Sequence, residues 1–201
     1  MRTILALLMF AVACTHSPIN RYESSTPDEK AHFKKVMLPF SPGTHFKISQ
    51  GAFGRWSHHD AGHEYTWDFD VRYGTLVLAV ESGTVIQVWE PNAGGGCDPK
   101  YNDSPHNVQV EQADGTVAQY THVQSLVKVG QKVSRGQPIA ATAKNGFICT
   151  PQLDFTVFRD RDHTFLKGHP RNIPLLFYGL PDGGMAHEGF DGEAEATPQS
   201  P

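Results

Sequence analysis

The sequence has little that would indicate a helical, membrane-spanning or nucleic-acid-binding protein. No segment carries a long apolar repeat with the 3.6-residue helical period between capping residues, so few or no helices are expected. The apolar run at residues 4–13 is too short to cross a bilayer. Lys and Arg are not clustered with aromatic residues and the net charge is -4, so no nucleic-acid partner is expected.

Turn-forming residues are plentiful instead. The 201 residues include 19 Gly and 14 Pro, and short segments rich in Val, Ile, Thr, Tyr and Phe lie between the turns. This pattern predicts a β-rich fold in one domain. Strands are expected at residues 45–49, 65–71, 76–80, 84–89, 107–112, 116–122, 138–142, 153–158 and 174–177.

The first residues have the features of a secretory signal peptide. Arg2 supplies the positive charge, and residues 11–13, Ala-Val-Ala, fit the small-residue rule for cleavage before Cys14. The same residues resemble a lipoprotein box, with Ala in place of the usual Leu. Lipidation of Cys14 is therefore predicted, with ordinary cleavage as the alternative. The chain is expected to be exported and to face the periplasm, at the outer membrane in a Gram-negative host, because Thr15 gives no aspartate-type retention signal.

Three cysteines are an odd number for an exported chain, in which thiols normally pair. If Cys14 carries lipid, Cys97 and Cys149 remain, and a disulfide between them is predicted. Free thiols or a metal bound by both are the alternatives. The disulfide would pin the turn-rich loop at residues 94–105, which would otherwise be a flexible insertion.

The composition divides the chain into four parts. Residues 1–13 are the signal peptide, and the polar residues 14–35 form a tether from the anchored cysteine. Residues 36–182 form the folded domain. Residues 183–201 lack apolar periodicity and are expected to be a disordered acidic tail.

The stretch at residues 57–80 contains the densest group of possible metal ligands. His58, His59 and His63 precede the expected strand that carries Asp68. Imidazole nitrogen and carboxylate oxygen are both zinc ligands. A polar loop with solvated histidines is the alternative, but three histidines near an aspartate in a strand-turn-strand frame favour a metal site.

Several motifs, in a fixed order, resemble the lysostaphin/LytM-type zinc endopeptidase domain. The motifs are Tyr-Thr-Trp-Asp-Phe-Asp at 65–70, Gly-Thr at 74–75 with the strand after it, Gly-Thr-Val at 83–85, Asp-Gly at 114–115, Gln-Tyr-Thr-His at 119–122, the Gly-Gln steps at 130–131 and 136–137, and Gln-Leu-Asp-Phe at 152–155. The resemblance covers residues 45–160. It implies an all-β fold, a compact and mostly antiparallel β-sheet or barrel-sandwich, with a groove over the sheet and a zinc ion. It also implies peptidoglycan peptides as substrate or, for a degenerate member, regulation of another cell-wall hydrolase.

The resemblance also assigns residues. The first zinc histidine corresponds to His58 or His59: the Ser-His pair favours His58, the spacing from Asp68 fits His59 slightly better, and His63 is a third candidate. Of the three, His58 is predicted. Asp68 corresponds to the zinc aspartate. His122 corresponds to the catalytic histidine of the Tyr-x-His motif.

The last motif departs from the family pattern. Its His-x-His becomes Gln152 and Asp154, in the places of a catalytic histidine and the third zinc ligand. Aspartate binds zinc, but a His-Asp-Asp set is harder and more anionic than His-His-Asp. Gln152 cannot take up a proton. Two hypotheses follow: a degenerate domain with weak or no metal binding, in which these two residues merely line a dead groove, or a working metallopeptidase with an altered ligand set. A carbohydrate-binding β-domain explains none of the ordered motifs.

Overall fold

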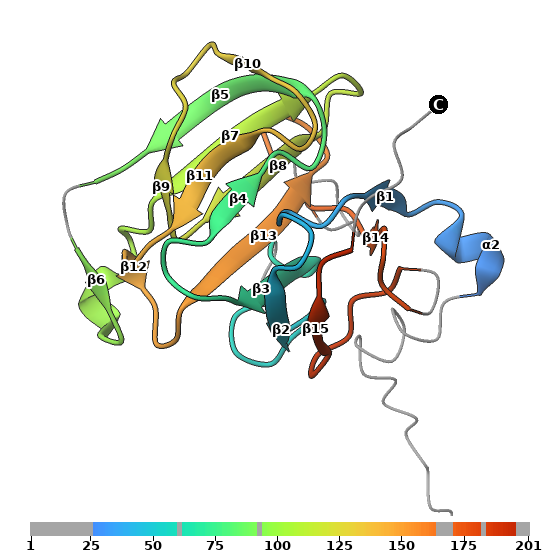
Figure 1. The fold of residues 1–201 in the computed structure, drawn as a ribbon, viewed down its shortest axis with the longest axis horizontal. Helices are drawn as coiled ribbons and strands as arrows, with labels where there is room; N and C mark the ends of the chain where they lie inside the picture. The colour runs from blue at the N-terminus through green and yellow to red at the C-terminus, as the bar shows by residue number, and fades with distance from the viewer. Residues whose placement is uncertain (1–25, 60–61, 92–93, 164–170, 182–183, 196–201) are drawn as a thin grey trace, which may run out of the picture.

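A computed structural model describes residues 26–59, 62–91, 94–163, 171–181 and 184–195. Within these ranges the helical segments are the four-residue helix α2 (Pro27–Lys30) and the 3-10 turn η1 (Pro99–Tyr101). No helix in the described ranges is long and apolar enough to cross a membrane. The remaining elements are strands, which confirms the all-β prediction (Figure 1).

The largest sheet has eight strands and is antiparallel throughout. Its order is β10-β5-β7-β8-β13-β3-β2-β15. In chain order these strands are β2 (His45–Gln50), β3 (Thr66–Asp70), β5 (Gly83–Trp89), β7 (Asn107–Gln112), β8 (Val117–Thr121), β10 (Lys132–Val133), β13 (Gln152–Phe158) and β15 (Asp191–Glu193). The adjacent strands β13 and β3 carry the last and first motifs of the candidate site.

Three smaller sheets complete the fold. One joins β4 (Leu76–Leu78), β11 (Pro138–Thr142) and β9 (Val123–Ser125), and it lies over the large sheet in Figure 1. The other two are parallel pairs, β1 (Lys34–Val36) with β14 (Leu175–Phe177), and β12 (Gly146–Phe147) with β6 (Gly95–Gly96).

Alternation along the strands separates the core from the site. On β3, Trp67 and Phe69 are fully buried in the hydrophobic core, as are Leu153 and Phe155 on β13. The residues between them on each strand must face the opposite side of the sheet. The side chains of the candidate site therefore lie on one face, and the aromatic core fixes the two strands that carry them.

The C-terminal segment that was predicted to be disordered contains a strand at the edge of the large sheet. Residues 191–193 form strand β15 against β2, and Met185, Ala186 and Ala194 are buried. The prediction for 183–201 is therefore wrong for 184–195, because three small or flexible apolar side chains and a backbone ladder anchor this segment. The folded part also begins before residue 36, since β1 starts at Lys34. The signal peptide, Cys14 and the first part of the tether lie outside the described residues.

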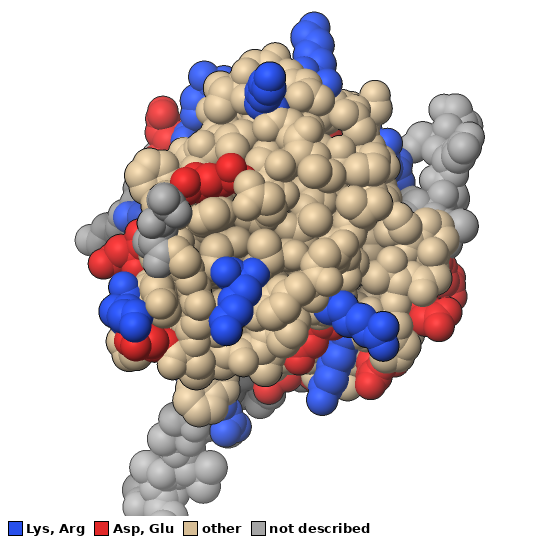
Figure 2. All heavy atoms as spheres, turned by 60° about the vertical axis from the view of Figure 1, so that its left-hand side comes forward, with Lys and Arg blue, Asp and Glu red and all other residues tan. Residues whose placement is uncertain are grey.

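Charges on the face turned forward in Figure 2 are scattered. Lys and Arg there are interspersed with Asp and Glu, and most of the surface belongs to other residues. The ion pairs among the described residues are single contacts, such as Lys100 with Asp98 at 3.0 Å. This face presents no continuous field of one sign.

Candidate metal centre

Two strands and one loop bring three possible metal ligands together. Asp154 on β13 is the direct register partner of Asp68 on β3. His58 comes from the loop between β2 and β3. One ligand atom of each residue lies within 4.8 Å of the others, and this is the one such His, Cys, Asp or Glu group within the described ranges. His59 and His63 are exposed and outside the group, so the loop selects His58 among the three candidates.

The tautomer of His58 is set by the backbone. Its Nδ1 lies 2.9 Å from the carbonyl oxygen of Gly51, which can only accept, so Nδ1 carries a proton and donates it. Nε2 therefore faces Asp68 Oδ2, at 3.6 Å, and it is buried without a hydrogen-bond partner. Burial alone lowers the pKa of His58, but the carboxylates of Asp68 and Asp154 outweigh it and hold the pKa above its ordinary value.

One oxygen of Asp68 is already occupied. Gln50 Nε2 donates to Asp68 Oδ2 at 2.9 Å, whereas Asp68 Oδ1 is buried without a partner. Buried polar atoms without partners are costly and rare in folded proteins. His58 Nε2 and Asp68 Oδ1 are two such atoms at one site, and both are the atom types that bind a divalent cation. The arrangement fits a metal ion.

Gln50 connects this aspartate to the histidine loop. Its Oε1 accepts from the backbone amides of Trp56 and Ser57 at 2.8 and 3.3 Å, and its Nε2 also donates to Ser57 Oγ at 3.1 Å. The loop turns tightly around this side chain. A Cβ on Gly54 would lie 2.1 Å from Gln50 Cγ, so the position requires glycine. The buried amide thereby holds the segment just before His58 against β3.

Asp154 is the most strongly perturbed carboxyl group at the site. Burial, reinforced by the charge of Asp68 and partly offset by His58, raises the pKa of Asp154 to about 7. Two carboxylates side by side with one imidazole give a more anionic set than two imidazoles and one carboxylate. Such oxygen-rich sets suit harder cations and reduce the Lewis acidity of zinc.

His122 lies beside the cluster at the end of β8. It directly follows Thr121, which is the register partner of Asp154. Its Nδ1 lies 2.9 Å from the carbonyl oxygen of Asn145 and donates to it, which leaves Nε2 as the basic nitrogen. Burial lowers the pKa of His122 below its ordinary value, so the ring is neutral near pH 7.

Asn145 fixes the backbone around His122, although it belongs to none of the motifs identified in the sequence. Its Oδ1 accepts from the amide of His106 at 2.8 Å, and its Nδ2 donates to the carbonyl oxygen of Val123 at 3.1 Å. His122 itself has φ +62°, an uncommon conformation for a non-glycine residue. Such a conformation persists when the surroundings determine it, as these bonds do.

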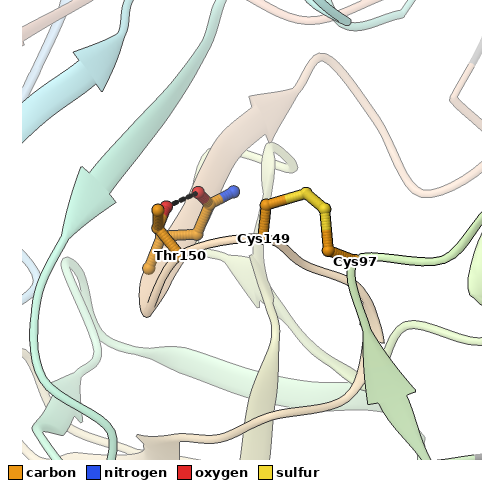
Figure 3. The surroundings of a disulfide bond; sticks show 4 residues. Cys97, Cys149 and Thr150 are labelled. Carbon is orange, nitrogen blue, oxygen red and sulfur yellow. Dashed lines mark hydrogen bonds between the residues drawn. A yellow bond between two sulfur atoms is a disulfide. The ribbon is translucent and has the colours of Figure 1, made fainter.

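Gln152 is the first residue of β13, the strand that carries Asp154. It is the register partner of Asp70, and its Oε1 accepts from Thr150 Oγ1 at 3.3 Å. Figure 3 shows this bond beside the disulfide between Cys97 and Cys149, which confirms the predicted pair. The disulfide ties the start of β13 to the loop around β6.

The segment that carries β3 and β13 matches a known protein family. The sequence profile of peptidase family M23 matches residues 62–166. This chain belongs to that family. The match confirms the resemblance to the lysostaphin/LytM type. His58 lies just outside the matched range, and the loop geometry is what places it in the site.

The matched segment covers only part of each individual M23 relative. Glycyl-glycine endopeptidase ALE-1 of Staphylococcus capitis is 31% identical over 98 residues, which is 48% of this chain and 25% of that protein. Lysostaphin of Staphylococcus simulans is 32% identical over 98 residues, 48% of this chain and 18% of that protein. The chain thus spans a quarter or less of the curated relatives it matches.

Solved structures with a similar fold include lysostaphin from Staphylococcus simulans and the M23 metalloprotease pseudoalterin. The first is 24% identical with a TM-score of 0.47, over 63% of this chain and 47% of that chain. The second is 15% identical with a TM-score of 0.46, over 84% of this chain and 99% of that chain.

Proposed function

We propose that this chain is a degenerate M23 domain of the cell envelope that binds the peptide part of peptidoglycan, at a weak divalent-metal centre, and cleaves it very slowly or not at all. Regulation of another cell-wall hydrolase is the role that fits such binding. The observation that carries the proposal is Gln152, which stands where a catalytic histidine is expected and whose side chain cannot carry a proton.

Metal binding is proposed from the geometry of the cluster. His58 Nε2, Asp68 Oδ1 and an oxygen of Asp154 would hold the ion, because the first two are buried without partners and the third lies within reach. When bound, zinc acts as a Lewis acid and lowers the pKa of a coordinated water. Asp154 must lose its proton to serve as a ligand, so its raised pKa weakens binding in mildly acidic conditions.

The loss of a base sets the expected rate. General acid–base catalysis contributes about 10²–10⁴-fold in typical enzymes. His122 has a neutral ring with Nε2 available, and it can accept one proton or donate a hydrogen bond to a peptide oxygen. One histidine does not replace two proton-carrying groups. Slow or absent hydrolysis follows.

Peptidoglycan as ligand is supported by family membership and by the named activity of one relative, a glycyl-glycine endopeptidase. The matched segment is less than half of this chain and a minor part of that protein. The ligand class is therefore proposed as peptide from the wall, without a specified cross-bridge.

An active zinc metalloendopeptidase with a His-Asp-Asp ligand set is the second candidate. The unpartnered His58 Nε2 and Asp68 Oδ1 favour it, together with the retained His122. The two candidates differ in rate and in metal content, and both quantities are measurable on the same preparation.

Metal content and wall digestion test the proposal together. The purified protein is loaded with zinc, dialysed and analysed for metal, then incubated with intact cell walls while soluble peptide is measured. Substoichiometric metal and no release above the control Asp68→Ala are expected. The double variant Gln152→His with Asp154→His restores the family's residues and should bind about one equivalent of zinc. Efficient digestion by the wild type would contradict the degenerate function and favour the second candidate.

A further inference from the structure

A short parallel ladder, closed by the disulfide, joins the loop around β6 to the segment before β13. Strands β6 and β12 pair over two residues each. The amide of Gly146 donates to the carbonyl oxygen of Gly94 at 3.0 Å, and the amide of Ile148 donates to that of Gly96 at 3.2 Å. An isolated pair of short strands is marginally stable at best. The disulfide at Cys149 follows directly and closes this ladder covalently.

Both cysteines of this bridge are exposed. Figure 3 shows the bridge spanning the segment after β6 and the segment before β13. A thiolate must reach a sulfur atom to break a disulfide, and exposed disulfides are more readily reduced than buried ones. Residues 94–103 are all exposed or half-buried, so little apolar burial holds this part of the loop once the bridge is open.

The same loop positions Asn145, which directly precedes β12. The Asn145 carbonyl oxygen accepts from His122 Nδ1 at 2.9 Å. A Cβ on Gly95 would lie 2.4 Å from Asn145 Cα, so the loop backbone packs directly against this residue. The amide of His106, just after the loop, donates to Asn145 Oδ1 at 2.8 Å. Both ends of the loop therefore contact Asn145, and Asn145 in turn contacts the histidine of the site.

The Asn145 carbonyl decides which ring nitrogen of His122 carries the proton. While Nδ1 donates to it, Nε2 keeps its lone pair and can accept a proton or a hydrogen bond. Without this acceptor, the neutral ring exchanges between its two tautomers. A molecule with the proton on Nε2 has no acceptor at that atom. The chemistry that His122 offers to a ligand therefore depends on the position of the Asn145 backbone.

We propose that the disulfide between Cys97 and Cys149 is a redox switch for the site, with Asn145 as the positioning residue that links it to His122. In the oxidised state the bridge holds the ladder of β6 and β12, and with it the Asn145 carbonyl, against Nδ1. A dithiol reductant breaks the S–S bond. Its two thiols are oxidised to a disulfide, and each cysteine sulfur takes up one electron and one proton. The ladder then opens, and the His122 ring is no longer held in one tautomer.

Nitrogen NMR of the imidazole rings tests the switch on the full chain. The His122 signals are those that disappear in His122→Gln, and at mildly alkaline pH the ring is neutral. The oxidised protein should show one tautomer, with the proton on Nδ1, and dithiothreitol should change its signals to those of a mixture. Amide exchange at Gly146 and Ile148 should accelerate at least about tenfold, because both amides lose the closed ladder.

Three results of this experiment would overturn the switch. The first is an unchanged tautomer in protein whose bridge is shown by mass to be reduced. The second is a bridge that resists dithiothreitol in the folded protein. The third is global unfolding on reduction, seen as loss of the native amide chemical shifts of β2 and β3, because the switch requires a local change.

A variant without the bridge controls for the reductant. The double variant Cys97→Ser with Cys149→Ser should show the tautomer mixture of the reduced protein, before and after dithiothreitol is added. Cys14 is unchanged in this variant, so any effect of the reductant on that residue would be detected. A double variant that keeps the single tautomer of the oxidised wild type would contradict the proposal.

Two glycines test the role of Asn145 with the bridge intact. The methyl group of Gly95→Ala would displace the Asn145 backbone, so the tautomer mixture is expected in the oxidised state. Gly96→Ala is the matched control on the same strand, because the nearest atom to its Cβ would lie 3.6 Å away, on Tyr101. A single Nδ1 tautomer in both variants would overturn the positioning role of Asn145.

Binding to isolated peptidoglycan separates this inference from the proposed function, on which the switch rests for its effect on a bound peptide. Wall binding by a protein whose His122 tautomer is independent of the redox state overturns the switch and leaves the proposed function in place. A redox-dependent tautomer without wall binding overturns the proposed function and leaves the switch. A redox-dependent tautomer together with a change in wall affinity on reduction supports both.

Discussion

Replacing Gln50 by Met should weaken metal binding and the fold by similar free energies. Methionine matches the length of glutamine but removes every hydrogen bond of the amide. Gln50 makes four such bonds, of which the one to Asp68 Oδ2 is buried and charged. The other three are made with Trp56 and Ser57. Both residues are exposed, so water replaces much of the hydrogen bonding that the variant loses there.

The expected losses of unfolding free energy and of metal affinity follow from these hydrogen bonds. A hydrogen bond to a charged group contributes about 1.5–3 kcal/mol, so the variant should lose roughly this free energy of unfolding. Removing an outer-shell partner of a ligand typically costs about 10–100-fold in metal affinity. The affinity should fall by this factor because Asp68 is no longer oriented and the His58 loop is no longer held to β3.

Two assays separate the effects. Urea unfolding with a chelator present gives the stability of the metal-free protein, and a zinc titration at fixed pH gives the affinity. Amide exchange at Trp56 and Ser57 should accelerate in the variant, since both amides lose their acceptor. Gln87→Met is the matched control, because Gln87 makes one side-chain bond, to Asn107 at 2.8 Å, on strand β5. Unchanged zinc affinity and unchanged exchange in Gln50→Met would refute the reasoning.

Three further perturbations are predicted. In metal-free protein the raised pKa of Asp154 contributes stability below the unfolded value of about 4 that is lost as pH rises towards 7, so Asp154→Asn should flatten the decline of unfolding free energy over this window; parallel pH profiles would contradict it. Replacing both Cys97 and Cys149 by Ala should cost about 2–4 kcal/mol in urea unfolding, because the bridge closes a separation of 52 residues; an unchanged midpoint would contradict it. Labelled fatty acid should enter the wild type and not Cys14→Ala in the native host; equal labelling of the two would argue against lipidation.

Several strands were predictable from their enrichment in β-forming residues and from alternation along the chain. Residues 107–112 and 138–142 match β7 and β11 at both ends, and β13 begins one residue before its predicted start. Strand β15 has the sequence Asp-Gly-Glu, with no apolar residue to indicate a strand. It exists because the backbone of β2 offers an open edge and because Ala194 is buried next to it.

The site was predictable as a set of residues but not as a geometry. Motif order selected Asp68, His122, Gln152 and Asp154, and the Ser-His pair favoured His58. The path of the loop that brings His58 to Asp68 could not be predicted. That path depends on the tertiary hydrogen bonds of Gln50, and no local sequence pattern reports such bonds.

The same alternation explains how this M23 domain can change its chemistry without losing its fold. Gln152 and Asp154 occupy the site face of β13, while Leu153 and Phe155 between and after them are fully buried. Exchanging two site-face residues leaves the core contacts and the ladder to β3 intact, because side chains on the two faces of a sheet pack independently. The destabilising effect is confined to the site, where the Asp154 carboxylate lies beside Asp68, its register partner. A cation bound between the two carboxylates would relieve that repulsion, and for this reason we predict weak metal affinity at this site whether or not it hydrolyses peptide bonds.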